Sequence, residues 1–323
     1  MKTFISTGTL PPPERVQALI DQAHREFKDN DEGRNASHYP ALSEVPRDLF
    51  AICLTDVQGN RYEAGVADYP FSIMSVCKPF AFALVSQALG LSEVRAKIGV
   101  NATGLPFNSV TAIEQNASHL TNPMVNSGAI ATVSLAPGAT AEEKWRFLYE
   151  GLCRFTGREL TVNQEIFTSA SASNHRNRAI ARILFDYNCL YFDPIETTDL
   201  YTKLCSLNVT VRDLAVMAAT LADGGYNPVT HERVVDAGQC APALAVMATA
   251  GMYENSGEWL LDIGLPGKSG VSGGIITVSP GKGGLATFAP PLDTAGNSVR
   301  GQLAIRYLAK AAGLGLFASK PAI

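Results

Sequence analysis

The sequence predicts an α/β fold of the α+β kind, in which the two chain ends build one antiparallel sheet and the middle is mainly helical. Apolar, β-rich segments occur in a pair near each end of the chain. Between these pairs, apolar residues recur at helical spacing. Strand pairs at both ends with helices between them place both ends in one sheet. We therefore expect a discontinuous sheet domain (1–70 and 265–323), a helical domain (71–264), and an active site in the cleft between them.

The N-terminal elements are an amphipathic helix and a hairpin. Residues 13–29 carry apolar side chains at helical spacing. Residues 49–57 are apolar and β-rich, Gln58-Gly59-Asn60 makes a turn, and residues 61–66 can return. Such a pattern predicts two antiparallel strands.

Local patterns also predict the elements in the middle and the C-terminal part of the chain. Thr210 and Asp213 resemble a capping box at the start of a helix that Gly224 ends. A second hairpin is expected from residues 270–278 and 285–289. Further helices are expected at 141–155, 174–187, 242–252 and 299–312.

Composition narrows the class of protein. The chain has 323 residues, 46% of them hydrophobic and 17% charged, with a net charge of −4 and no basic run. We therefore expect about two folded domains and no nucleic-acid partner. No apolar stretch reaches the roughly 18 residues of a membrane span, so we expect no membrane partner. Six scattered cysteines favour buried thiols in a cytoplasmic protein over disulfides or zinc, and we expect no metal.

Ser75 and Lys78 form the first candidate catalytic pair. Three residues apart on a helix, they lie on one face. A partly desolvated lysine can lose its proton near neutral pH and accept the proton of a hydroxyl. Pro79 suits a first helical turn, and the apolar run 80–89 buries the helix. The non-catalytic interpretation of such a motif is a solvated lysine near a helix start. A second Ser-x-x-Lys occurs at 279–282, but Pro-Gly makes a turn there, so that motif has no catalytic interpretation.

Lys268-Ser269-Gly270 adds a second element far along the chain. This segment resembles the third motif of the serine acyl-transfer enzymes that include penicillin-binding proteins and class A β-lactamases. Together the two motifs indicate a covalent serine hydrolase that needs neither metal nor catalytic histidine. Cys77 is a rival nucleophile, but it lies two residues from Ser75 and points to another helix face.

Further segments together resemble the serine-dependent glutaminase family, in order, from about Tyr39 to Pro280. They are Phe107-Asn108-Ser109, Asn122 to Ile130, Arg176 to Ile180, Met217 to Gly225, Gly251 to Tyr253 and Gly264 to Ile275. The resemblance implies a β-lactamase-like fold, hydrolysis of the glutamine side-chain amide, no cofactor, a small-molecule amide as partner, and a homo-oligomer, either a dimer or a tetramer.

The resemblance also implies roles for matching residues. Ser75 would be the nucleophile, Lys78 its base, and Tyr253 the group that passes a proton to the leaving ammonia. The N–H groups of Ser75 and Val271 would form the oxyanion hole. Without the resemblance, Asn126 and Asn177 would be taken for turn or cap residues. The residues that would bind the substrate are Tyr39, Asn126, Asn177, Tyr201, Lys268, Ser269 and Gly270.

Two substrate-site positions depart from the family pattern. Met74 stands where the family has a glutamine, and Ala170 stands where it has a glutamate that pairs with the substrate α-ammonium. No carboxylate occurs from Thr168 to His175. Three interpretations therefore stay open: a glutaminase, the same mechanism on an amide without a free α-amino group, and a non-catalytic ligand-binding homologue. Penicillin-binding or β-lactamase activity is the least favoured.

Overall fold

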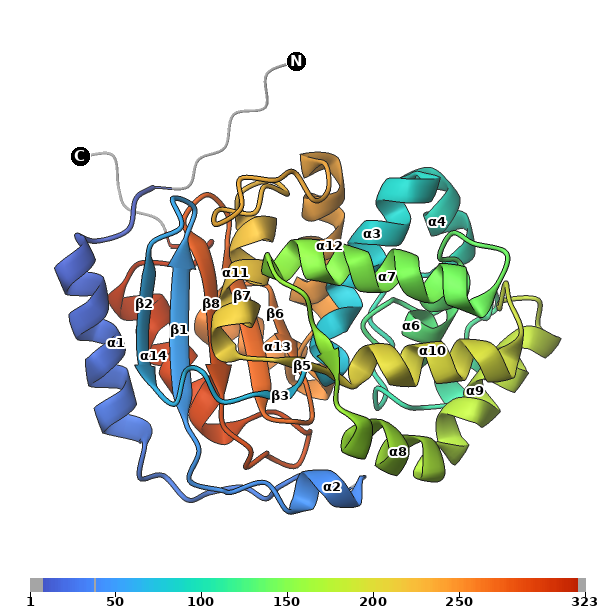
Figure 1. The fold of residues 1–323 in the computed structure, drawn as a ribbon, viewed down its shortest axis with the longest axis horizontal. Helices are drawn as coiled ribbons and strands as arrows, with labels where there is room; N and C mark the ends of the chain where they lie inside the picture. The colour runs from blue at the N-terminus through green and yellow to red at the C-terminus, as the bar shows by residue number, and fades with distance from the viewer. Residues whose placement is uncertain (1–7, 38, 319–323) are drawn as a thin grey trace.

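A computed structural model describes residues 8–37 and 39–318 (Figure 1). Its main sheet is antiparallel, with the strand order β2-β1-β8-β7-β6. The strands are β1 (Ala51–Asp56), β2 (Arg61–Gly65), β6 (Gly267–Ser269), β7 (Gly274–Ser279) and β8 (Gly283–Phe288). Leu54 of β1 lies opposite both Tyr62 of β2 and Leu285 of β8. The two chain ends therefore share one sheet, as the sequence predicted.

Helices cover both faces of this sheet. Because side chains alternate along a strand, Ile52 and Leu54 of β1 point to one face and Ala51 and Cys53 to the other. The first pair packs with α1 (Pro13–Phe27) and α14 (Val299–Ala311). The second pair lies in the larger core, and α11 (Val211–Ala222) packs against β1 and β8 there. The sheet is thus the middle layer of a three-layer arrangement.

Most of the remaining helices gather beside the sheet (Figure 1), whereas α13 packs against α14. Helix α3 follows directly on the short 3₁₀ turn η1, and its first nine residues are all buried. The bounds are α2 (Pro40–Ser43), η1 (Met74–Cys77), α3 (Lys78–Leu89), α4 (Leu91–Lys97), α5 (Thr111–Glu114), α6 (Asn126–Ser134), α7 (Ala141–Thr156), α8 (Gln164–Ser173), α9 (His175–Asp186), α10 (Pro194–Cys205), α12 (Ala237–Ala250), η2 (Tyr253–Asn255) and α13 (Ser256–Ile263).

A second, three-stranded sheet was not foreseen from the sequence. It has the order β3-β5-β4, with β3 at Phe71–Ser72, β5 at Leu207–Val209 and β4 at Thr161–Val162. Strands of two or three residues are too short to show alternation. This small sheet anchors the chain directly before η1.

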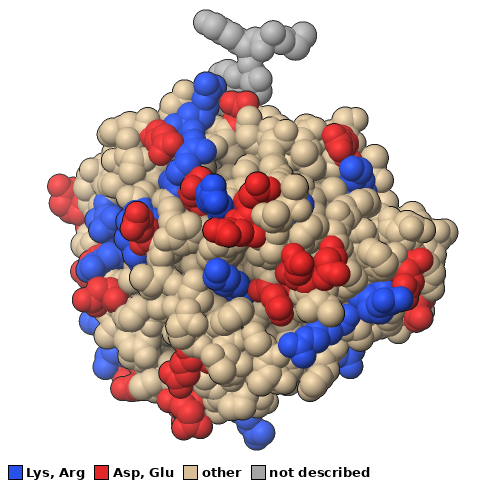
Figure 2. Space-filling view, turned by 45° about the vertical axis from the view of Figure 1, so that its right-hand side comes forward, with Lys and Arg blue, Asp and Glu red and all other residues tan. Residues whose placement is uncertain are grey.

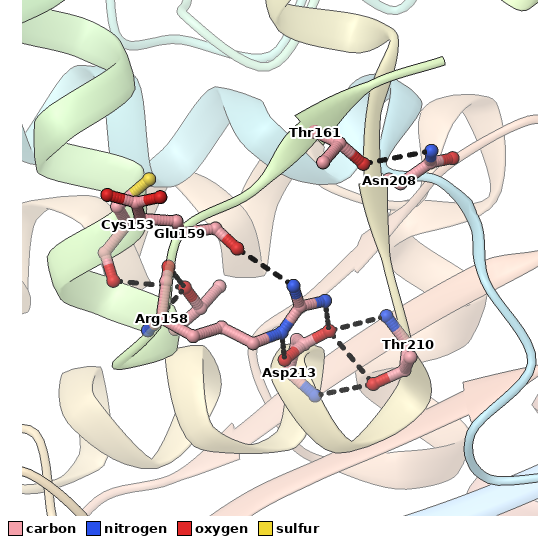
Figure 3. Close-up of polar contacts among 8 residues, drawn as sticks. Cys153, Arg158, Glu159, Thr161, Asn208, Thr210 and Asp213 are labelled. Carbon is pink, nitrogen blue, oxygen red and sulfur yellow. Dashed lines mark hydrogen bonds and ion pairs between the residues drawn. The ribbon is translucent and has the colours of Figure 1, made fainter.

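A capping network ties α7 to α11 beside this small sheet (Figure 3). The predicted capping box is present, because the Thr210 side chain accepts from Asp213 N and the Asp213 carboxylate accepts from Thr210 N. The Arg158 guanidinium also binds both oxygens of Asp213, at 2.8 and 2.6 Å. Thr161 accepts a hydrogen bond from Asn208 across the strand pair.

The predicted starts of β7, β8 and α12 were wrong, and β8 begins at Gly283 instead of 285. Strand β7 begins at Gly274, not at 270, because residues 270–273 make the turn from β6, with Gly270 N donating to Gly274 O. Gly273 has φ +103°, and a Cβ there would lie 2.3 Å from Ala289 O. Helix α12 begins at Ala237 instead of 242, and Pro242 lies inside it. Proline usually marks a first turn, which misplaced the expected start.

The division into domains at residues 70 and 264 stays a prediction. Helix α11 lies within 71–264 but packs on the sheet. In the described part of the chain, no single helix is long and apolar enough to span a bilayer. The pair Met74–Leu89 and Leu91–Lys97 passes that test only when joined across a 118° bend. On the face drawn in Figure 2, acidic and basic side chains are interspersed.

Candidate active site

A cavity of about 190 Å³ lies between the β6–β7 turn and the helices η1, α6, α8, α9 and α10. Residues far apart in the sequence meet here, because η1 contacts both β6 and α10. The predicted site residues that line this cavity are Tyr39, Met74, Ser75, Asn126, Ala170, Asn177, Tyr201 and Val271.

Ser75 sits on η1 at the floor of the cavity. The preceding Met74 has φ +46°, a left-handed conformation that is strained for a bulky residue and occurs often at functional sites. Gly270 lets the end of β6 approach this turn, since a Cβ there would lie 3.1 Å from Ile73 O. Within the described residues, the backbone N–H groups of Ser75 and Val271 have no acceptor. Both are therefore free to bind an oxyanion at the cavity.

Lys78 is 2% exposed and begins α3. Its Nζ donates to Met124 O at 3.1 Å and to Asn126 Oδ1 at 2.8 Å. No carboxylate forms an ion pair with it in the described structure, and burial lowers the pKa of Lys78 to about 8. A neutral amine has two N–H groups and one lone pair. Two carbonyl oxygens occupy the N–H groups, which leaves the lone pair free to accept a proton.

Asn126 connects this amine to the wall of the cavity. Its Nδ2 donates to Asn177 Oδ1 at 2.9 Å, and its Oδ1 also accepts from the Tyr201 hydroxyl at 3.4 Å. Its backbone N donates to Phe107 O at 2.7 Å. Asn126 is the first residue of α6, but its side chain makes no capping bond. Without the resemblance Asn126 would have been taken for a turn or cap residue, but the N-cap of α6 is Val125, and the Asn126 side chain bonds to Lys78, Asn177 and Tyr201.

Tyr253 lies behind the cavity, in a left-handed conformation with φ +56°. Its ring packs between Phe107, with centroids 4.6 Å apart, and the Lys268 Nζ, 4.6 Å from the ring centre. Its hydroxyl donates to Ser269 O at 3.0 Å. Burial raises the pKa of Tyr253 well above its usual value, and hydrogen bonding with Ser75 and Ser269 opposes that shift.

Lys268 is a second buried amine without a carboxylate among the residues described. It is 0% exposed and donates to Gly251 O at 3.0 Å and to Ser269 O at 2.6 Å. Burial, and then the charge of Lys78, hold the pKa of Lys268 well below its usual value. The Ser269 hydroxyl is buried without a partner. The predicted residues that stand behind the lining rather than in it are Lys78, Tyr253, Lys268, Ser269 and Gly270.

Sequence reasoning gave no role to several residues of the lining. Arg176 and Asn108 lay inside the segments that carried the resemblance, and Arg176 Nη1 donates to Asn108 O at 3.3 Å. Cys205 follows Tyr201 by one turn of α10, so helical spacing could have found it. Asn174, which we expected as a possible contact for a neutral or anionic group, also lines the cavity. The lining residues without an assigned role are Phe107, Asn108, Ser173, Arg176, Thr202, Cys205 and Ser206.

The described lining of the cavity carries positive but no negative side-chain charge. Among the described lining residues, Arg176 is charged and none is acidic. Ala170 on α8 is 3% exposed and faces the cavity with a methyl group. No group of three His, Cys, Asp or Glu side chains that could hold a metal ion occurs in the described ranges. The site is thus suited to an anionic or neutral ligand.

The sheet, the helices and a serine on a turn beside a buried lysine define a β-lactamase-like protein. A family model described as glutaminase matches residues 33–317, and the chain belongs to this family. Glutaminase 2 of Yersinia pestis is 61% identical over 98% of this chain and 94% of its own. The solved structure of a probable glutaminase, YbaS, has a TM-score of 0.94 at 41% identity, covering 96% of this chain and all of the other.

Another solved structure carries chemical information. It is the covalent complex of the Bacillus subtilis glutaminase YbgJ with 5-oxo-L-norleucine, formed with 6-diazo-5-oxo-L-norleucine. It is 31% identical with a TM-score of 0.84, covering 95% of this chain and all of that chain. The predicted fold class and the predicted family are thereby confirmed.

Proposed function

We propose that this protein hydrolyses the side-chain amide of L-glutamine to L-glutamate and ammonia through an acyl-enzyme on Ser75. The observation that carries the proposal is the position of Ser75 in the cavity, one helical turn before a buried lysine with no carboxylate partner in the described structure. Family membership and the 61% identical glutaminase support the same reaction.

The geometry suggests which residue carries out each step of the hydrolysis. Neutral Lys78 accepts the Ser75 proton as Oγ attacks the amide carbon. The backbone N–H groups of Ser75 and Val271 stabilise the oxyanion, and such a donor typically contributes about 3 kcal/mol. Tyr253 passes a proton to the leaving nitrogen, which departs as ammonia. Water then cleaves the ester and releases the carboxylic acid.

Substrate binding would use neutral groups and the positive character of the cavity. Tyr39, Asn126, Asn177 and Tyr201 offer phenol and amide groups to the amino-acid end of the substrate. A carboxylate bound there is attracted by Arg176 and by any charge on Lys78. We extend the proposal to a cytoplasmic homo-oligomer, supported by six free thiols and by the family resemblance, and testable by light scattering.

The test is ammonia release by single variants. Ser75→Ala should lose turnover by several orders of magnitude while keeping its fold, and Lys78→Ala should be similarly inactive. Cys77→Ala should stay active. The reagent 6-diazo-5-oxo-L-norleucine should alkylate the Ser75 hydroxyl with loss of dinitrogen, leaving a 5-oxo-L-norleucine group whose mass is found on Ser75. Substantial turnover by Ser75→Ala would refute the covalent mechanism. A wild-type protein that binds glutamate but releases no ammonia would support the third interpretation, a non-catalytic ligand-binding homologue.

Ala170 supports a second candidate, the same chemistry on an amide without a free α-amino group. The described lining of the cavity offers no carboxylate for an ammonium. Loss of a charged partner from a buried site typically costs about 3–5 kcal/mol, roughly a 100- to 1,000-fold loss or more for glutamine. Met74 adds an apolar wall.

Ammonia release should therefore be compared over glutamine, asparagine, glutaramate and N-acyl glutamines. Ala170→Glu should raise the kcat/KM ratio of glutamine to glutaramate at least about tenfold, or roughly 1.4 kcal/mol. If the wild type prefers glutamine and the ratio does not move, the second candidate is wrong and a plain glutaminase stands.

A further inference from the structure

Two cysteines touch each other directly behind the candidate nucleophile. Cys77 Sγ and Cys205 Sγ are 3.9 Å apart, and the side chains are 0% and 9% exposed. Cys77 lies on η1 between Ser75 and Lys78, and Cys205 ends α10. Neither thiol has a part in the proposed hydrolysis, so their contact needs another account.

A position at the active-site cavity and a direct contact between the sulfur atoms distinguish this pair from the other thiols. Cys205 lines the active-site cavity and is 9% exposed, so we expect a small solute that enters the cavity to reach its side chain. Cys77 does not line this cavity, and its sulfur contacts that of Cys205. In the described structure, no thiol–thiol contact joins the other four cysteines, Cys53, Cys153, Cys189 and Cys240.

We propose that Cys77 and Cys205 form a redox-sensitive thiol pair, a modification site for hydroperoxides, whose disulfide switches the active site off. The existence of the disulfide is independent of the proposed function, whereas the loss of activity rests on it. Mapping the disulfide and measuring activity therefore separate the two claims.

The chemistry balances with a hydroperoxide as the oxidant. The Cys205 thiolate attacks one peroxide oxygen, the O–O bond breaks, and hydrogen peroxide leaves one molecule of water and a sulfenic acid. The Cys77 sulfur then attacks the Cys205 sulfur, the S–O bond breaks, and a second water leaves as the disulfide forms. Two thiols are oxidised by two electrons and one peroxide is reduced.

The electrostatics of the pair agree with this order of events. The hydrogen bond from Cys77, together with the charges of Lys78 and Lys268, lowers the pKa of Cys205 despite its burial. Burial and the same hydrogen bond raise the pKa of Cys77. The thiol that faces the cavity is thus the better nucleophile, and the inner thiol is placed to resolve it.

Closure of the disulfide would distort the site. The sulfur atoms must approach from 3.9 Å to about 2.05 Å. Cys77 lies two residues after Ser75 and directly before Lys78, and Cys205 follows Tyr201 by one turn of α10. We therefore expect the movement to be shared by both sides of the cavity. A misplacement of about 1 Å can cost about 100-fold in rate. We expect at least a tenfold loss of kcat in the oxidised protein.

The experiment uses the full chain, reduced and then treated with hydrogen peroxide for increasing times. Remaining thiols are alkylated, and peptides are mapped without reduction while ammonia release from the best substrate is followed. A cross-linked Cys77–Cys205 peptide should appear at the rate at which activity falls, and dithiothreitol should reverse both. Cys77→Ser should form no such peptide and keep its activity, whereas the matched control Cys240→Ser should behave like the wild type.

Two results would overturn the proposal. The first is full loss of activity without a Cys77–Cys205 peptide. The second is equal inactivation of Cys77→Ser and the wild type, which would place the damage elsewhere. If Cys77→Ser fails to fold, the wild-type map alone decides. A cross-link that forms without loss of activity would keep the thiol pair but refute its action as a switch.

Discussion

Replacing Lys78 with methionine should change how the stability of this protein depends on pH. Burial lowers the pKa of Lys78 from 10.5 to about 8. One unit of pKa corresponds to about 1.36 kcal/mol, so holding the charged amine in the folded state costs about 3 kcal/mol below pH 8. Between pH 8 and 10.5 the unfolded chain binds more protons than the folded one. Stability therefore rises with pH across this window.

The magnitude can be worked out for two conditions. From pH 7 to 9.5, the lysine contribution should rise by about 2 kcal/mol in the wild type and not at all in Lys78→Met. With about 2.1 cal/mol/K per residue for the unfolding entropy, 323 residues convert this to a Tm difference of about 3 °C. Methionine also leaves Met124 O and Asn126 Oδ1 without the lysine donor. That cost does not depend on pH, so the change of Tm with pH is the informative quantity.

The assay is a Tm measurement of both proteins over this pH range, with Lys310→Met as the control at an exposed lysine. The same ionisation should appear in catalysis, since kcat/KM of the wild type should rise up to about pH 8 and then level off. Parallel Tm curves for the wild type and Lys78→Met would show that the amine has an ordinary pKa. The argument for Lys78 as a base would then fail.

Three further predictions follow from the geometry. Tyr253→Phe keeps the ring between Phe107 and Lys268 but removes the proton donor, so kcat should fall by about 10²- to 10⁴-fold with little change in KM; an unchanged kcat would remove Tyr253 from the mechanism. Ammonia release should survive a strong chelator, since no metal-binding cluster occurs in the described residues, and loss that zinc or magnesium restores would contradict the site. Thr210→Ala removes a helix cap and should lower stability by about 1 kcal/mol, or about 1–2 °C in Tm, and an unchanged Tm would mean that the cap adds nothing.

The elements that the sequence predicted well are those with a local signal. The hairpin at 49–66 has an apolar, β-rich run before a turn at Gly59, and the helix after Thr210 begins with its own capping box. Each of these signals depends on neighbouring residues alone. The small sheet β3-β5-β4 has no such signal, because its strands are too short and come from distant parts of the chain.

The features of the candidate site also fall into those with a local sequence signal and those without one. Ser75 and Lys78 were found because their spacing is local. The hydrogen bond from Lys78 to Asn126 joins residues 48 apart, and the packing of Tyr253 between Phe107 and Lys268 depends on the folded chain. Neither contact follows from a pattern in the sequence. The resemblance marked these residues as important, but only the structure gives the atoms through which they act.

In the described structure, both lysines of the candidate site, Lys78 and Lys268, are held by carbonyl oxygens and not by carboxylates. Lys78 donates to Met124 O and Asn126 Oδ1, and this neutral support fixes the amine without stabilising its charge. A carboxylate in the same place would raise the pKa of Lys78 and keep the amine protonated. The lack of acidic groups in the described lining therefore favours the base, while at Ala170 it removes a partner for an ammonium. Ala170→Glu should change both properties at once, gaining the ammonium contact and shifting the kcat/KM profile toward higher pH. Specificity is therefore measured by the ratio of kcat/KM for glutamine to kcat/KM for glutaramate at one pH. The protonation state of Lys78 in the free enzyme affects both values equally and cancels in this ratio.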